Sequence, residues 1–191
     1  MLVLGIDPGT VHLGWGVVKR QGTRLFHVAH GVVSPPTDTD FAERLCFIHE
    51  ALVEVLARHA PTCGAVETLF FHKDPLAAAK LGHARGVALL ALAHAGLSVA
   101  EYQPARVKRT VAGKGQATKR QVALMVRVLL ALDAPPPSDA ADALAVAITH
   151  LRIGSLPSAV ESHLRGGRSS RPLSPESRPA RHPGSSRRRG S

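Results

Sequence analysis

Cysteine is almost absent from this chain of 191 residues. Cys46 and Cys63 form no CxxC or Cys/His pattern, which excludes a disulfide framework and a zinc site, so we expect both to be ordinary core thiols. The longest apolar stretch, residues 86–100, is interrupted by His94 and is too short for a membrane span. No basic segment followed by a long apolar stretch opens the chain. We therefore predict a cytoplasmic protein without membrane contact or a secretory signal.

Acidic residues are also scarce, with 14 Asp and Glu against 24 Lys and Arg. This excess favours a polyanionic partner such as nucleic acid or an anionic membrane surface, but it does not specify a fold. The imbalance is concentrated from Glu161 onward, where eight arginines accompany two glutamates and few residues are apolar. We predict a folded domain over residues 1–158 and a disordered basic tail over 159–191.

The order of apolar patterns predicts an α/β protein. Short turns separate the first three strand-like runs and predict an antiparallel meander over residues 2–7, 12–18 and 25–33. Apolar residues then recur at helical spacing over 41–60. Further along we expect strands at 63–70 and 97–102 and helices at 74–96, 117–132 and 138–152. The expected fold is a mixed five-stranded sheet flanked by helices.

Two acids interrupt apolar strand patterns. Asp7 closes the first strand, directly before the Pro8–Gly9 turn, where an aspartate commonly hydrogen-bonds its own turn. Glu67 lies within the apolar run "CGAVETLF". If the first and fourth strands are parallel neighbours, both side chains emerge at one edge of the sheet, where functional groups gather in α/β proteins.

Asp139 and Asp142 open the last helix and share one face of its first turn. Considered alone, they are explained by the helix dipole, because each acid at a helix N-terminus stabilises the helix by about 0.3–1 kcal/mol. Together with Asp7 and Glu67 they would repel strongly unless a cation neutralised them. Carboxylate oxygens suit Mg²⁺ or Mn²⁺, and two such ions about 3.5–4 Å apart serve phosphodiester hydrolysis. In that arrangement Asp7 would bridge both ions.

Five motifs resemble, in order and spacing, the RuvC family of bacterial Holliday-junction resolvases over residues 1–152. They are "GIDPGTVHLGWGVV", "AVETLFF", "KLGHARGVALL", "VKRTVAGKGQATKRQV" and "DAADALAVAITH". The resemblance implies an RNase H-like fold and a homodimer that cuts two opposed strands of a four-way DNA junction, in recombination and repair. It implies two Mg²⁺ or Mn²⁺ ions per active site, held by Asp7, Glu67, Asp139 and Asp142. It also implies cooperation with the RuvA and RuvB branch-migration proteins and cleavage at short T-rich sites.

The same resemblance assigns DNA contacts. Phe70 matches an aromatic residue that inserts beside unpaired bases at the junction centre, although adjacent Phe71 could serve and both could be core aromatics. Seven basic residues and no acid lie between Arg106 and Arg127, which favours phosphate contact over a merely solvated surface. Within this segment Lys108 and Lys119 match basic positions of the family.

Other residues leave two interpretations open. His150 lies near the face of Asp142 and either tunes the site or packs as an ordinary histidine. Gly82 and Gly86 permit close helix approach, either to a second subunit or to the chain's own sheet.

Three other functions compete with junction cleavage. An actin-like ATPase or sugar kinase has a phosphate loop similar to "GIDPGT", but it needs a second domain and a second phosphate loop, for which this chain has no room. An RNase H-like nuclease acting on RNA would share the four acids. A junction-binding module with an inactive site is the third alternative. Cleavage of a synthetic four-way junction with and without Mg²⁺ separates them.

Overall fold

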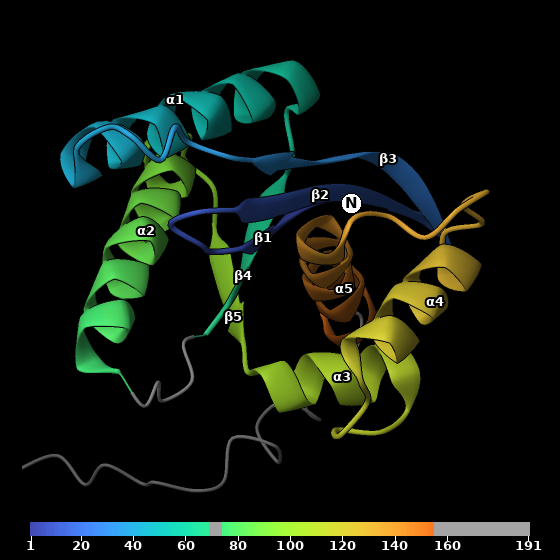
Figure 1. The fold of residues 1–191 in the computed structure, drawn as a ribbon. Coiled ribbons are helices and arrows are strands. Elements are labelled where there is room, and N and C mark those ends of the chain that lie inside the picture. Colours follow the sequence, from blue (N-terminus) through green and yellow to red (C-terminus); the bar gives the residue numbers. More distant parts are fainter. Residues whose placement is uncertain (69–73, 155–191) are drawn as a thin grey trace, which may run out of the picture. The chain divides into compact units, whose positions relative to one another are not determined.

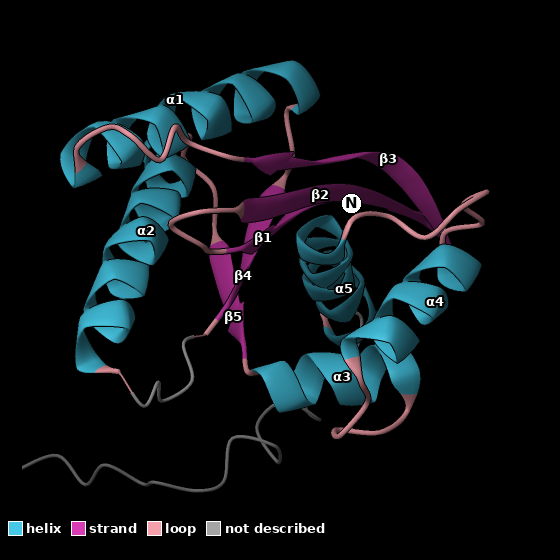
Figure 2. Ribbon diagram, in the orientation of Figure 1, coloured by secondary structure: helices cyan, strands magenta, loops and turns pink. Residues whose placement is uncertain are grey.

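The computed structural model describes residues 1–68 and 74–154 and confirms the α/β class (Figures 1 and 2). Its elements are, in order, β1 (Leu2–Asp7), β2 (Leu13–Gln21), β3 (Arg24–Val33), α1 (Phe41–His59), β4 (Cys63–Glu67), α2 (Pro75–His94), β5 (Val99–Tyr102), α3 (Pro104–Ala112), α4 (Lys119–Leu129) and α5 (Ser138–Ile153). The domain boundary at 158 and the tail over 159–191 lie outside the described residues and stay predictions.

The five strands form one mixed sheet in the order β3-β2-β1-β4-β5. As predicted, β1, β2 and β3 make an antiparallel meander, and β4 pairs parallel to β1. Strand β5 continues the parallel half of the sheet. Ile6 of β1 lies opposite Val66 of β4, so the next residue of each strand, Asp7 and Glu67, emerges at the same edge.

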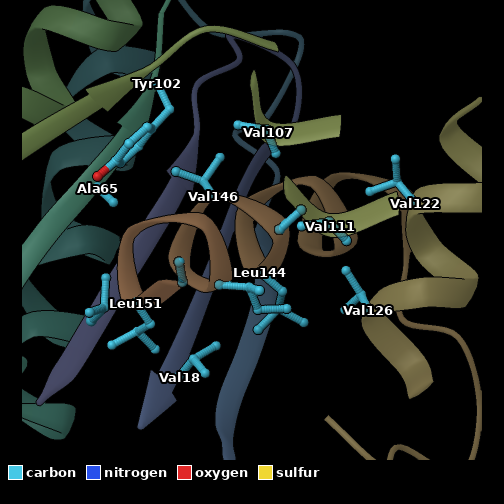
Figure 3. Packing of buried hydrophobic residues seen from close by; sticks show 14 of the residues in the cluster. Val18, Ala65, Tyr102, Val107, Val111, Val122, Val126, Leu144, Val146 and Leu151 are labelled. Carbon is cyan, nitrogen blue, oxygen red and sulfur yellow. The ribbon is translucent and has the colours of Figure 1, made fainter. Parts of the chain in front are cut away.

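Both faces of the sheet are covered by helices. Strand β1 shows why, because its residues alternate between the two sides. Leu4 and Ile6 pack with the buried side chains of α1 and α2, whereas Val3 packs with those of α3, α4 and α5. Figure 3 shows this second cluster, in which side chains from α3 and α4 gather around the central helix α5.

Helix α5 lies unusually close to the sheet, and ten of its sixteen residues are buried. A Cβ atom added to Gly5 of β1 would lie 2.1 Å from the carbonyl oxygen of Ala143. One added to Gly14 of β2 would lie 2.0 Å from the carbonyl oxygen of Asp139. Because only glycine leaves room for this approach, these two residues fix where the start of α5 crosses the sheet.

Helix α3 was not predicted from the sequence, although its signals are ordinary ones. Pro104 stands at its start, Val107 and Val111 form its buried face, and Gly113 ends it with a φ of 78°. The helix is only nine residues long and carries three basic side chains.

The two cysteines have different environments. Cys63 is buried in β4, as predicted, but Cys46 is exposed, so the prediction of a core thiol there was wrong. The buried side of α1 runs through Ile48, Leu52 and Leu56, and Cys46 points away from it.

Helix α2 begins as predicted, because the Asp74 side chain accepts a 2.9 Å hydrogen bond from the Leu76 backbone N–H. By length and composition it is the one helix of the described chain that could cross a membrane, a test that core helices of soluble proteins also meet. Its residues Ala84, Ala88 and Leu92 pack in the same cluster as β1.

Candidate active centre

Two neighbouring strands place the first two acids. Asp7 is the last residue of β1 and Glu67 the last of β4. The chain after Glu67 is held by the Thr68 backbone N–H, which donates to the Tyr102 carbonyl at 2.9 Å. Both acids are half-buried. The prediction that they leave the sheet at one edge is therefore confirmed.

Helix α5 brings the other two acids to this edge. Gly14, against which the carbonyl of Asp139 packs, is also the cross-strand neighbour of Asp7. Asp142 follows three residues later on the same face of the helix, and both aspartates are half-buried. We call Asp7, Glu67, Asp139 and Asp142 the carboxylate cluster.

The four carboxylates act on one another electrostatically. Burial raises the pKa of Asp7 to about 8, and the charges of Glu67, Asp142 and Asp139 add to that increase. Burial together with repulsion from Asp142 raises the pKa of Glu67 to about 7. A group of acids with such high pKa values has an excess of negative potential, which a bound cation would relieve.

Two lysines predicted to contact DNA lie beside the cluster. Lys119 Nζ is 3.0 Å from Asp142 Oδ2, and this hydrogen bond raises the pKa of the lysine. Lys119 begins α4, whose start is fixed by a capping box between Thr118 and Gln121. Lys108, on α3, is near enough to Glu67 for its charge to lower the pKa of that acid. The structure thus places both lysines at the acidic edge.

The cluster has the right donors for a hard divalent cation. Its ligand atoms are all carboxylate oxygens, which Mg²⁺ and Mn²⁺ prefer. Within residues 1–68 and 74–154, no three Asp, Glu, His or Cys side chains are gathered closely enough to hold an ion as they stand. Binding therefore requires side-chain rotation within a group that is already electrostatically coupled.

Other site predictions have different outcomes. Phe70 and Phe71 lie outside the described residues.

His150 Nδ1 shares a 2.8 Å hydrogen bond with the Tyr102 hydroxyl, which links α5 to β5 and supports the interpretation of His150 as a packing residue. A Cβ added to Gly86 would meet nothing within 4 Å, so this glycine does not serve close packing on the chain's own sheet.

Sequence reasoning missed Arg44. Its guanidinium donates from Nη2 to the carbonyl of Thr10, in the loop that follows Asp7. Arg44 Nε is also buried without a hydrogen-bond partner in the described part of the chain. Its place in α1, between Glu43 and Leu45, gave no signal that it reaches back to the loop at the end of β1.

Comparison with known proteins identifies close relatives of the whole folded region. The family model described as "Crossover junction endodeoxyribonuclease RuvC" matches residues 3–150. A protein of that name from Sorangium cellulosum is 60% identical over 151 residues, which cover 79% of this chain and 84% of the relative. One from Azorhizobium caulinodans is 55% identical over 148 residues, which cover 78% of this chain and 88% of the relative.

Solved structures give the same picture. Thermus thermophilus RuvC in complex with a Holliday junction substrate is 44% identical, with a TM-score of 0.76, and covers 81% of this chain and 97% of that one. The yeast mitochondrial Holliday junction resolvase Ydc2 is 13% identical, with a TM-score of 0.60 and coverage of 85% and 82%. At that identity the likeness to Ydc2 shows a shared fold alone.

Proposed function

Because this chain belongs to the RuvC family of crossover junction endodeoxyribonucleases, we propose that the carboxylate cluster is the active centre with which it resolves four-way DNA junctions. The observation that carries this proposal is the convergence of four acids from β1, β4 and α5, with the pKa of Asp7 raised to about 8. A cluster so costly to ionise is typical of a functional site. Family membership does not favour the kinase or RNA-nuclease alternatives.

The family is metal-dependent, and we propose two Mg²⁺ or Mn²⁺ ions held by the carboxylate cluster. Divalent ions bound there would supply polarisation of the phosphodiester and a lower pKa for a bound water. Asp7 ends the central strand β1, between β2 and β4, and would be held by both neighbouring strands while contributing oxygens to the ions. Asp139 and Asp142, one helical turn apart, close the cluster from the side of α5.

Junction DNA is held by the basic elements beside the cluster. Lys108 of α3 and Lys119 of α4 are placed where backbone phosphates would approach the acids, and they offset the repulsion between phosphate and carboxylate. We propose that Phe70 inserts at the junction centre, and this assignment rests only on its match to the family motif. We also propose a cytoplasmic location, which agrees with a DNA substrate.

Paired nicks need two active centres, and we propose a homodimer. A groove of about 480 Å³ between α1 and α2 supports an interface there, because it is lined by Leu45, Gly86 and the half-exposed Leu90. The RuvA and RuvB partnership rests on the family resemblance.

Substitution of Leu90 tests the dimer. We expect Leu90→Arg to yield a monomer that nicks one strand, whereas Leu76→Arg, at a more exposed position of the same helix outside the groove, stays dimeric. Equal dimerisation of both variants in analytical ultracentrifugation would place the interface elsewhere.

The Asp7→Asn variant tests the active centre. It keeps the size of the side chain but removes a charge on which cation binding depends, so we expect cleavage of a synthetic four-way junction to be lost. Binding of the junction in EDTA should persist, because lysine–phosphate contacts need no metal. Cleavage at the wild-type rate would overturn the assignment, and an RNA–DNA hybrid in the same assay tests the alternative substrate.

A further inference from the structure

A second charged site lies at the opposite end of α5 from the carboxylate cluster. It is a cavity of about 640 Å³ whose lining includes Arg20, Arg24 and Arg152, and no acidic residue of the ranges 1–68 and 74–154 lines it. Its apolar lining comes from Leu25, Leu129 and Leu151. We call it the arginine cavity. Three positive charges around an apolar floor would attract an anion and shield it from water.

The guanidinium groups are held in place by the protein. Arg20 Nη1 donates to the Leu151 carbonyl at 2.6 Å, and Arg152 Nη1 donates to the Thr110 carbonyl at 2.8 Å. The guanidinium carbon of Arg24 lies 5.3 Å from the centre of the Phe26 ring. A guanidinium has five N–H donors, so the contacts of Arg20 and Arg24 orient these two groups while leaving them able to donate to a ligand. Such a site is organised before anything binds.

Stabilisation of the helix terminus explains only part of this arrangement. Basic side chains near the C-terminus of a helix interact favourably with its carbonyls, and Arg20 does so at Leu151. Arg24 belongs to the edge strand β3, is exposed, and stacks on Phe26 of its own strand. Its presence in the lining therefore calls for another explanation.

We propose that the arginine cavity binds a phosphate group. Arginines recognise phosphate by paired, charge-assisted hydrogen bonds, and several around one cavity suit its oxygens better than a single carboxylate. The phosphate belongs either to the DNA backbone or to a free polyphosphate. Ten residues of α5 separate Asp142 from Arg152, which is about 15 Å at 1.5 Å per residue. This distance is shorter than one arm of a bound junction, so an arm that runs along this side of the protein would span it.

The site goes beyond the proposed function; its DNA branch rests on the proposed junction binding, whereas its polyphosphate branch does not, and a matched pair of variants tests both. Arg24→Glu reverses one charge of the cavity, and Lys19→Glu makes the same change at an exposed position of neighbouring β2 that is not part of the lining. Thermal melting of both full-length variants, and Arg24→Ala as a milder change, separates loss of binding from loss of folding.

Two probes distinguish the sources of phosphate. The first is pyrophosphate, titrated calorimetrically in EDTA, where the carboxylate cluster repels the anion. The second is a pair of four-way junctions with short and long arms, whose binding is measured by fluorescence anisotropy in EDTA. If the ligand is DNA, Arg24→Glu weakens binding of the long-armed junction about tenfold more than Lys19→Glu does. Binding of the short-armed junction by Arg24→Glu then equals that of the wild type.

If the ligand is a free polyphosphate, wild-type protein and Lys19→Glu bind pyrophosphate saturably and Arg24→Glu and Arg24→Ala do not. The proposal is overturned if pyrophosphate does not bind and the two charge reversals affect long-armed junctions equally. It is also overturned if folded Arg24→Ala binds both probes like the wild type.

Discussion

Lys119 and Asp142 form an ion pair, with 3.0 Å between Nζ and Oδ2, in which the lysine is mostly exposed and the aspartate mostly buried. The cation therefore stands at the mouth of the carboxylate cluster and can meet both the acids and an incoming phosphate. No other Lys–Asp pair lies within ion-pair distance in the described ranges. The pair joins the carboxylate cluster to the basic residues that we propose contact DNA.

Removal of this cation should change the salt dependence of DNA binding. Each phosphate contact contributes about −0.9 to the slope of log K against log salt concentration. We expect Lys119→Gln to reduce the steepness of that slope by about 0.9 for junction binding in EDTA, and Lys108→Gln to act similarly. Lys19→Gln, remote from the cluster, is the matched control. An unchanged slope for Lys119→Gln would show that this lysine serves only its aspartate.

Cation binding should grow stronger as pH rises. The pKa values of about 8 for Asp7 and about 7 for Glu67 mean that, without a cation, the folded state keeps protons that the unfolded state loses near pH 4. The metal-free protein therefore loses stability as pH rises from about 4 to 8, and cation binding displaces those protons.

We thus expect the rise in Tm caused by Mg²⁺ or Mn²⁺ to be larger at pH 8.5 than at pH 6. Asp7→Asn should melt higher than the wild type at pH 8.5 in EDTA and show little response to the metal. A metal-induced Tm shift that is independent of pH would contradict the coupling.

The close approach of α5 to β2 predicts a severe effect from one methyl group. In Gly14→Ala the new Cβ meets the carbonyl of Asp139, a backbone atom that cannot move without displacing the helix. We expect a loss of about 2–4 kcal/mol in unfolding free energy and a strong loss of cleavage. Gly115→Ala, whose nearest contact is 3.4 Å, is the control for stability in urea denaturation. Equal stability of the two variants would show that α5 has room to shift.

Much of this site follows from the sequence because its acids interrupt simple patterns. Asp7 and Glu67 end buried strands, and parallel pairing alone brings them to one edge. The spacing of Asp139 and Asp142 gives their common face. Electrostatic coupling and the Lys119–Asp142 pair depend on how helices pack on the sheet, which no local pattern specifies.

The missed features have different causes. Helix α3 is short and rich in basic residues, and the contact from Arg44 to Thr10 joins residues 34 positions apart. Cys46 was misplaced because cysteine is more often buried than exposed, and the periodicity of α1 was the better guide.

A histidine pair on the edge strand should make the fold sensitive to acid. His27 Nε2 and His30 Nδ1 share a 2.8 Å hydrogen bond, and burial lowers the pKa of both rings. Below pH 6.5 the unfolded state binds more protons than the folded state, so stability falls as pH decreases. We expect His27→Gln to flatten the decline in urea-denaturation free energy between pH 7 and 5. His83→Gln, an exposed histidine of α2, should not.

The basic tail gives a prediction from composition alone. A chain that ends at Val160 loses eight arginines, so we expect it to fold and cut a junction at the same positions while binding linear duplex more weakly at low salt. Salt titrations with the full and shortened chains compare the two slopes. Equal slopes exclude a role for the tail in DNA binding, and loss of cleavage places the domain boundary further along the chain.

Helix α5 supplies two of the four acids and is the last described element along the chain. During synthesis, Asp7 and Glu67 emerge long before Asp139 and Asp142, and the sheet face that α5 covers stays open until then. A partly made chain therefore has half a cluster and an unfinished core at the same time. The step that completes the hydrophobic interior also completes the carboxylate cluster, so the active centre that we propose forms only when the chain has folded.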